Sequence, residues 1–371
     1  MMGHLMKQEL IESSNKEAVI LIPCFGAKSQ NQYLDYLVLG LTTRLEDRQV
    51  SLESEDIKIK GQSGKRLTYD SLDGKRKTID IYEAYWNDLI NPLSSKNIKE
   101  QVIKGFFLLL YWLFSRFWHM ARKSRILFAH FMILLLLNVL WYYGNLTLAL
   151  TTIGQNPGAF GLQLPSEWAA QLVALGKFLG GWQIWVITSC ILGLLPVPIS
   201  SLVDLTDFTA RYLQDETQAG VGGIRDRTRQ RVVNILNDII KQDDYSKVTI
   251  LAHSFGVTIG IDLIADYRPK TNKPIRYISM GGAIELMSYK SAWVMEEAAK
   301  CLDNPLLTSW NDYYSDQDWI CTKTPTPRNA QPHNFKNIKM RLRVPLAQQI
   351  VGGSHDSYFF ERPLLEDLLD G

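Results

Sequence analysis

The chain has 371 residues and a formal net charge of +2, so it can hold one large α/β domain or two smaller ones. It has no basic stripe studded with aromatic residues, and no nucleic-acid partner is expected. Its four cysteines are scattered without CxxC spacing, which fits a reducing compartment and argues against a structural zinc site. Residues 1–19 lack an apolar segment, so no cleavable signal peptide is expected.

The first predicted elements are those of an α/β sheet. Residues 18–23 form a short apolar run typical of a strand that is buried on both faces. The chain then turns at Phe25, and a helix is expected over 33–45. Further strands are predicted over 51–61 and 65–86, the latter containing an Asp-Gly hairpin turn.

Three strongly apolar runs follow, over 105–120, 126–150 and 175–195. A transmembrane helix needs about 20 predominantly apolar residues. If the strands before and after this insert share one sheet, the number of spans must be even. We therefore predict a transmembrane hairpin of 126–150 and 175–195, with 105–120 as an interfacial helix. The other pairing, 105–120 with 126–150, stays open, as does a role for 105–120 as a lid.

The charges around the insert predict its orientation. Lysines and arginines are frequent before the first span and after the second, whereas only Glu167 and Lys177 are charged between them. By the positive-inside rule, both termini and the domain outside the insert face the cytoplasm. This predicts an integral membrane protein, with the lipid bilayer as a partner. The expected domains are 1–100 and 201–371, forming one unit, and the membrane insert 101–200.

The second half of the chain returns to alternating helices and strands. Helices are expected over 204–213, 225–240 and 363–369, and strands over 248–251, 276–280, 306–314 and 338–344.

Ser254 stands at the joint between the strand at 248–251 and the helix that follows. A sharp strand–turn–helix joint can lift a serine hydroxyl off the sheet and aim the helix N-terminus at the reacting centre. Ala252 and Gly256 provide the small residues that such close packing requires. The alternative is an ordinary strand–helix unit in which Ser254 caps the helix. His253 is expected to point away from the serine in a structural role.

A nucleophilic serine needs a base, and the imidazole base needs a carboxylate that fixes its tautomer. Asp318 and His355 follow Ser254 in the order serine, acid, histidine, each on a predicted loop after a strand. Asp316 is an alternative acid, and His333 is an alternative base.

The A-H-S-F-G turn and this order of residues resemble the lipase and esterase branch of the α/β-hydrolase-fold serine hydrolases. The resemblance covers residues 17–100 and 201–371. It implies an α/β-hydrolase fold, a mostly parallel sheet flanked by helices. The predicted helical membrane insert, which interrupts this fold, lies outside the resemblance. Residue by residue, it implies Ser254 as nucleophile, Asp318 as acid and His355 as base.

The resemblance also implies an oxyanion hole built from the backbone N–H groups of Phe25 and Phe255, although lipases often have His-Gly where this chain has Phe25-Gly26. The expected function is a membrane-anchored serine hydrolase that cleaves carboxylic esters or thioesters of lipid or acyl substrates through an acyl-enzyme. No metal or organic cofactor is required. An inactive hydrolase-fold scaffold and a peptidase or amidase are the alternatives.

Overall fold

The computed structural model describes residues 16–26, 29–71, 74–90, 98–113, 125–194, 199–215, 222–241, 245–269, 273–318, 321–345, 348–349 and 353–370. The chain divides into two compact units. The first comprises Met1–Pro92 and Asp207–Gly371, and the second is Leu93–Thr206. Each unit is described by itself.

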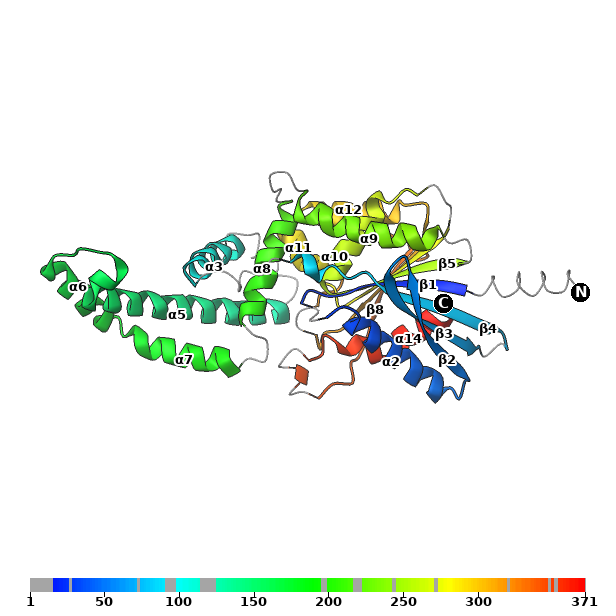
Figure 1. Cartoon of the computed structure of the whole chain (residues 1–371), viewed down its shortest axis with the longest axis horizontal. Helices are drawn as coiled ribbons and strands as arrows, with labels where there is room; N and C mark the ends of the chain where they lie inside the picture. The colour runs from blue at the N-terminus through cyan, green and yellow to red at the C-terminus, as the bar shows by residue number, and fades with distance from the viewer. Residues whose placement is uncertain are drawn as a thin grey trace, which may run out of the picture. The chain divides into compact units, whose positions relative to one another are not determined.

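The first unit is built on a mixed sheet of eight strands in the order β2-β3-β4-β1-β5-β6-β7-β8 within the described residues (Figure 1). The strands are β1 (Lys16–Ile22), β2 (Leu52–Ile59), β3 (Gln62–Asp70), β4 (Arg76–Glu83), β5 (Lys247–His253), β6 (Ile275–Met280), β7 (Leu307–Tyr314) and β8 (Phe335–Lys339). β2, β3 and β4 pair antiparallel, whereas every pair from β4 through β1 to β8 is parallel. The predicted α/β class with a mostly parallel sheet is confirmed.

Helices cover both faces of this sheet, which explains why β1 and β5 are apolar almost throughout (Figure 1). One face packs against α2 (Gln32–Asp47), η4 (Ser357–Phe360) and α14 (Arg362–Asp370), and the other against α9 (Ile224–Ile240), α10 (Phe255–Asp266) and α12 (Trp293–Leu302). The unit also contains the short elements η1 (Asn87–Leu89) and α11 (Ile284–Lys290) and the last residues of α8 (Ile199–Leu213). Because β1 lies between β4 and β5, the two distant portions of the chain share one sheet.

The last strand ends earlier than predicted: β8 is Phe335–Lys339, whereas the sequence pattern suggested 338–344. Ladder bonding to β7 stops when Met340 N donates to Tyr314 O over 2.8 Å. The next backbone donors are taken by side chains, since Leu342 N donates to Gln317 Oε1 over 2.7 Å. Met340 and Leu342 are still buried, so the alternating apolar residues over 338–344 reflect side-chain burial and not a strand.

The second unit is helical. It contains α3 (Ile98–Leu113), α5 (Arg125–Gln155), η3 (Pro157–Phe160), α6 (Ser166–Phe178), α7 (Gly181–Leu194) and the first residues of α8 (Ile199–Leu213). Glycines allow α6 and α7 to pack closely on α5: a Cβ at Gly144 would lie 2.7 Å from Trp185 Cβ, and one at Gly176 would lie 2.9 Å from Thr147 O.

The predicted transmembrane hairpin is wrong, and so is the integral-membrane localisation with a cytoplasmic hydrolase domain. Among the described residues, no helix combines the length and apolar character needed to cross a bilayer. The run at 175–195 is broken by Gly180, whose φ of 60° ends one helix before α7 begins. The 14 residues of α7 extend only about 21 Å at roughly 1.5 Å per residue, against a hydrocarbon core of about 30 Å.

The helix α5 is longer, but Asn138, Asn145 and Thr147 interrupt the apolar run in its described part. The expected interfacial helix over 105–120 lies partly in α3, and its residues 114–120 are outside the described residues.

Candidate active site

Ser254 occupies the sharp joint between β5 and α10 that the sequence predicted. Its φ of 58° and ψ of −123° lie in a region that a non-glycine residue occupies only at a cost of about 1–3 kcal/mol. Although Ser254 is the residue before the first helical position, its side chain makes no capping hydrogen bond. Helix capping therefore does not explain why a serine stands here, and its hydroxyl is free for chemistry.

The turn is held tightly from two sides. A Cβ at Gly256 would lie 2.5 Å from Ile22 O and 2.8 Å from Pro23 O, so only glycine fits where α10 passes the end of β1. On the other side, Ser254 N donates to Met280 O over 3.0 Å at the end of β6. These contacts over-determine the strained backbone of Ser254.

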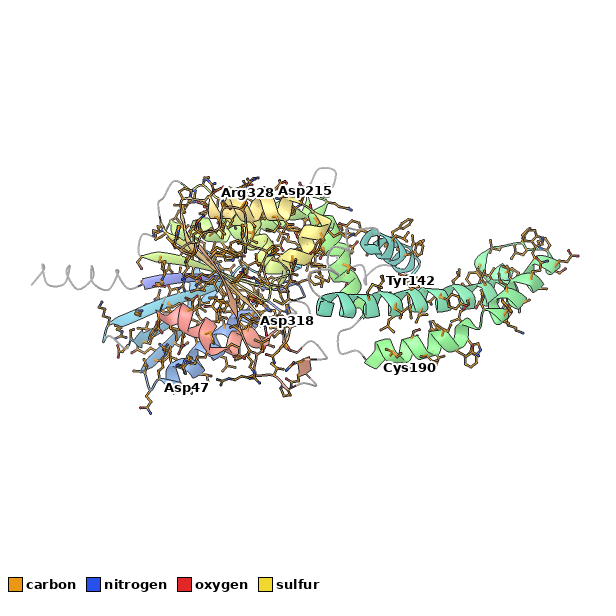
Figure 2. The ribbon with its side chains drawn as sticks, turned by 180° about the vertical axis from the view of Figure 1, so that it is seen from behind. Asp47, Tyr142, Cys190, Asp215, Asp318 and Arg328 are labelled. Carbon is orange, nitrogen blue, oxygen red and sulfur yellow. The ribbon has the colours of Figure 1, made fainter. Side chains whose placement is uncertain are left out.

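His355 is paired with Asp318, which lies in the loop after β7 in the sheet-containing unit (Figure 2). The distance from His355 Nδ1 to Asp318 Oδ2 is 2.8 Å, and Asp318 is buried. The alternative acid, Asp316, is exposed and forms an ion pair with Lys339 instead. The alternative base, His333, is exposed in the loop before β8.

Two opposing effects set the pKa of His355. Burial of the imidazole lowers it, but the charge of Asp318 and the hydrogen bond to that carboxylate raise it by more. The net result is a pKa above the ordinary value of about 6.5. The Asp318 carboxylate also requires Nδ1 to carry the proton, so Nε2 of neutral His355 has the lone pair that a base needs.

Ser254 and the His355–Asp318 pair both lie beside the turn after β6. Gly281 follows Met280, which holds the Ser254 backbone, and a Cβ at Gly281 would lie 3.4 Å from His355 Cε1 and 3.5 Å from Asp318 Oδ2. No hydrogen bond joins the hydroxyl of Ser254 to His355, although both residues are described. Catalytic hydrogen bonds often form only when substrate is bound, so the geometry is compatible with a serine–histidine pair.

The two predicted oxyanion donors also lie on facing turns. Phe25 follows β1, and Phe255 is the first residue of α10. Within the described residues, neither backbone N–H has a hydrogen-bond partner. Their rings pack on the same neighbour, because Phe208 lies 5.5 Å from the Phe25 ring and 5.1 Å from the Phe255 ring between centroids.

Asn87 and Trp86 clamp the turn at Phe25, and sequence reasoning did not single out either residue. Asn87 Oδ1 accepts from Gly26 N over 2.7 Å, while Asn87 Nδ2 donates to Cys24 O over 3.0 Å. Trp86 Nε1 donates to Pro23 O over 3.0 Å. The only signal in the sequence was an asparagine a few residues after the strand that became β4, which is too common a feature to identify a site.

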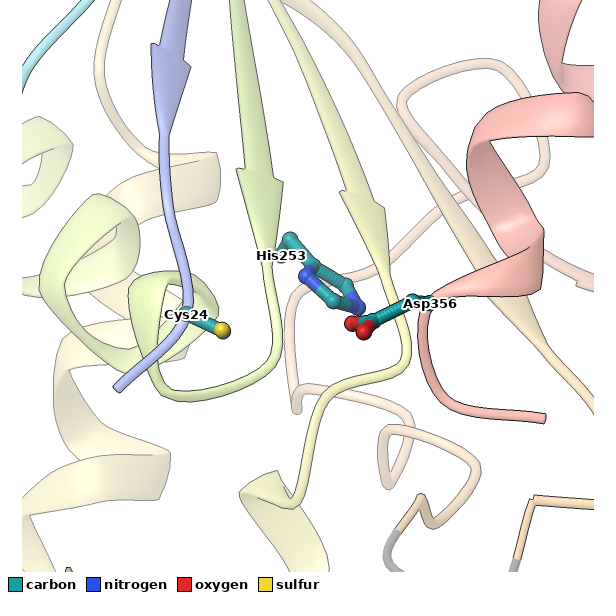
Figure 3. Close-up of side chains that lie close together, drawn as sticks. All are labelled: Cys24, His253 and Asp356. Atoms are coloured by element: carbon teal, nitrogen blue, oxygen red, sulfur yellow. The ribbon is translucent and has the colours of Figure 1, made fainter. Parts of the chain in front are cut away.

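One cluster has the ligand types of a metal centre. Cys24, His253 and Asp356 offer ligand atoms that all lie within 4.8 Å of one another (Figure 3). The Cys24 thiol instead donates to Tyr33 Oη over 2.8 Å, and Tyr33 Oη donates to Asp356 Oδ1 over 3.4 Å. Burial raises the pKa of the Cys24 thiol well above its usual range, which opposes the thiolate that a metal binds. The cluster therefore serves best as a hydrogen-bond network.

Glu83 is a fully buried carboxyl at the end of β4. Neither side-chain oxygen accepts a hydrogen bond of normal geometry from any residue that the structure describes, and burial raises the pKa of Glu83 to about 7. The folded protein therefore keeps the proton that the unfolded chain loses above about 4.5. The stability that protonated Glu83 contributes is fully present below about pH 4.5 and is lost as the pH rises to about 7.

We expect Glu83→Gln to remove this loss of stability at high pH, because glutamine does not ionise. The difference between a Glu83 pKa of about 7 in the folded protein and one of about 4.5 in the unfolded chain corresponds to roughly 3.5 kcal/mol at pH 8. Thermal unfolding of both proteins at pH 5 and pH 8 provides the measurement. The difference in Tm, variant minus wild type, should be several degrees larger at pH 8, and an equal difference at the two pH values would contradict the argument.

Comparison of the chain with protein-family models, with curated proteins and with solved structures finds no match.

Proposed function

We propose that the protein is a serine hydrolase of the α/β-hydrolase fold, which cleaves carboxylic ester or thioester bonds through an acyl-enzyme. The observation that carries the proposal is the strained Ser254, whose side chain makes no capping bond, and which lies beside the same turn after β6 as His355 and its buried partner Asp318. A strained backbone at one residue, maintained by contacts on two sides, is typical of a functional position.

Each residue has a separate role in the proposed reaction. Neutral His355 takes the proton of Ser254 as Oγ attacks the carbonyl carbon, and Asp318 stabilises the imidazolium that forms. The backbone N–H groups of Phe25 and Phe255 hold the negative charge that develops on the carbonyl oxygen. His355 then returns the proton to the leaving alcohol or thiol, and water attacks the acyl-enzyme with His355 again acting as base.

The substrate class is limited to acyl esters and thioesters. A lipid substrate was expected because a transmembrane hairpin would hold the site at a bilayer, and without that hairpin the argument for a lipid has no support.

Covalent labelling tests the proposal. Purified protein is incubated with a fluorophosphonate probe, and the modified peptide is identified by mass spectrometry. We expect one probe per chain, attached to Ser254, and prior heat denaturation should abolish the reaction. A folded protein that takes up no probe, or takes it up elsewhere, would support an inactive scaffold. Parallel assays with p-nitrophenyl esters and peptide anilides at equal concentration distinguish an esterase from an amidase.

A further inference from the structure

His253 is the last residue of β5, directly before the proposed nucleophile, and its side chain is fully buried. Its Nε2 lies 2.8 Å from the backbone carbonyl oxygen of His355. A carbonyl oxygen can only accept, so Nε2 carries the hydrogen and donates it. The rings of His253 and His355 lie 4.7 Å apart between centroids, with 34° between their planes.

This hydrogen bond joins the two sides of the proposed site. His355 lies in a turn that leads into η4, whereas Ser254 is attached covalently to β5, in the middle of the sheet. From these contacts we propose that His253 is a positioning residue: its Nε2–H holds the backbone of the His355 loop at a fixed place relative to Ser254. The inference rests on the proposed function and adds a residue that acts through His355 rather than on the substrate.

The surroundings of His253 explain why a neutral, rigid donor suits this position. Burial lowers the pKa of His253 well below its ordinary value, and the nearby His355 lowers it further. A charged donor would repel the imidazolium that forms on His355 when it takes the serine proton. The titratable groups that face His253 are Cys24, Tyr33, His355, Asp356 and Tyr358.

Packing fixes the orientation of the His253 ring. Its centroid lies 5.7 Å from that of Tyr33 and 5.0 Å from that of Phe359, with an edge-on contact to the latter. Nδ1 of His253 is buried without a hydrogen-bond partner among the described residues, so the one bond from Nε2 is the polar anchor of this side chain. A phenylalanine would fill the same space but could not donate.

The experiment compares His253→Phe with His253→Gln, whose amide can reach the position of Nε2. We expect His253→Phe to lower kcat for a p-nitrophenyl ester and the rate of fluorophosphonate labelling by about 10- to 100-fold, with KM changed less than about twofold. His253→Gln should recover most of this loss. Tyr267→Phe is the control, because it deletes one partly buried hydrogen bond, to Asn237, and should leave the labelling rate unchanged.

Two results would overturn the positioning role. In one, His253→Phe labels and turns over at the wild-type rate. In the other, His253→Phe and His253→Gln lose activity equally and in proportion to a fall in Tm, which would assign His253 to packing alone. Either result leaves labelling of the wild-type Ser254, and hence the proposed function, intact. Wild-type protein that takes up no probe would overturn the proposed function and the positioning role together.

Discussion

Ser254→Ala should abolish probe labelling and lower kcat for a carboxylic ester by roughly 10⁶-fold, because no other group on the turn can form the acyl-enzyme. The fold should remain, since the Ser254 hydroxyl makes no capping bond in the native structure. We therefore expect Tm to change by no more than about 2 °C, which corresponds to less than about 1 kcal/mol. Steady-state hydrolysis and thermal unfolding of the same preparation provide the two measurements.

Ser246→Ala is a matched control for this variant. Ser246 immediately precedes β5 and donates to Lys16 O over 3.0 Å, so it lies at the opposite end of the strand from Ser254. We expect full activity and labelling from Ser246→Ala. Hydrolysis that persists in Ser254→Ala at a comparable rate would mean that Ser254 is not the nucleophile.

Asp318→Asn is expected to lower kcat by about 10⁴-fold, because the amide can favour the wrong tautomer of His355 and carries no charge to stabilise the imidazolium.

The pH dependence of activity has a definite sign. His355 acts as a base only when neutral, so activity rises as the pH rises through its pKa. Asp318 holds that pKa above its ordinary value of about 6.5. The inflection in kcat/KM of the wild type should therefore lie above pH 6.5, and in the variant it should move to lower pH.

Asp316→Asn provides the matched control for Asp318→Asn, two residues away in the same loop. Asp316 is exposed and paired with Lys339, so its loss should change kcat less than about twofold and leave the inflection in place. If Asp316→Asn were the more damaging change, or if Asp318→Asn left the inflection unmoved, the assignment of the acid would be wrong.

The sheet could be predicted from local patterns because each strand carries its own signal. The apolar runs that became β1 and β5 are buried on both faces, and a run of that kind is stable only between two layers of helices. The position of Ser254 between β5 and α10 could be predicted for the same reason, since a strand pattern changes to a helix pattern at that residue. The end of β8 could not be predicted, because the next backbone N–H group, that of Leu342, donates to a side chain and not to β7.

The membrane hairpin was mispredicted because the mean hydropathy of a run of residues does not show whether the run is one helix. Gly180 adopts a left-handed conformation that separates α6 from α7, and the apolar residues on either side pack in two shorter helices. One apolar side chain of α7, Trp185, packs on α5 at Gly144.

The sequence by itself determined the α/β class and the order serine, acid, histidine along the chain, because strand periodicity and turn residues act over a few neighbouring positions. Only the tertiary structure decided that His355 pairs with Asp318 and not Asp316, that Asn87 clamps the turn at Phe25, and that His253 holds the His355 backbone. Each of these hydrogen bonds joins residues more than 30 positions apart in the chain, and its formation depends on burial and direction in the folded core, which local sequence does not encode.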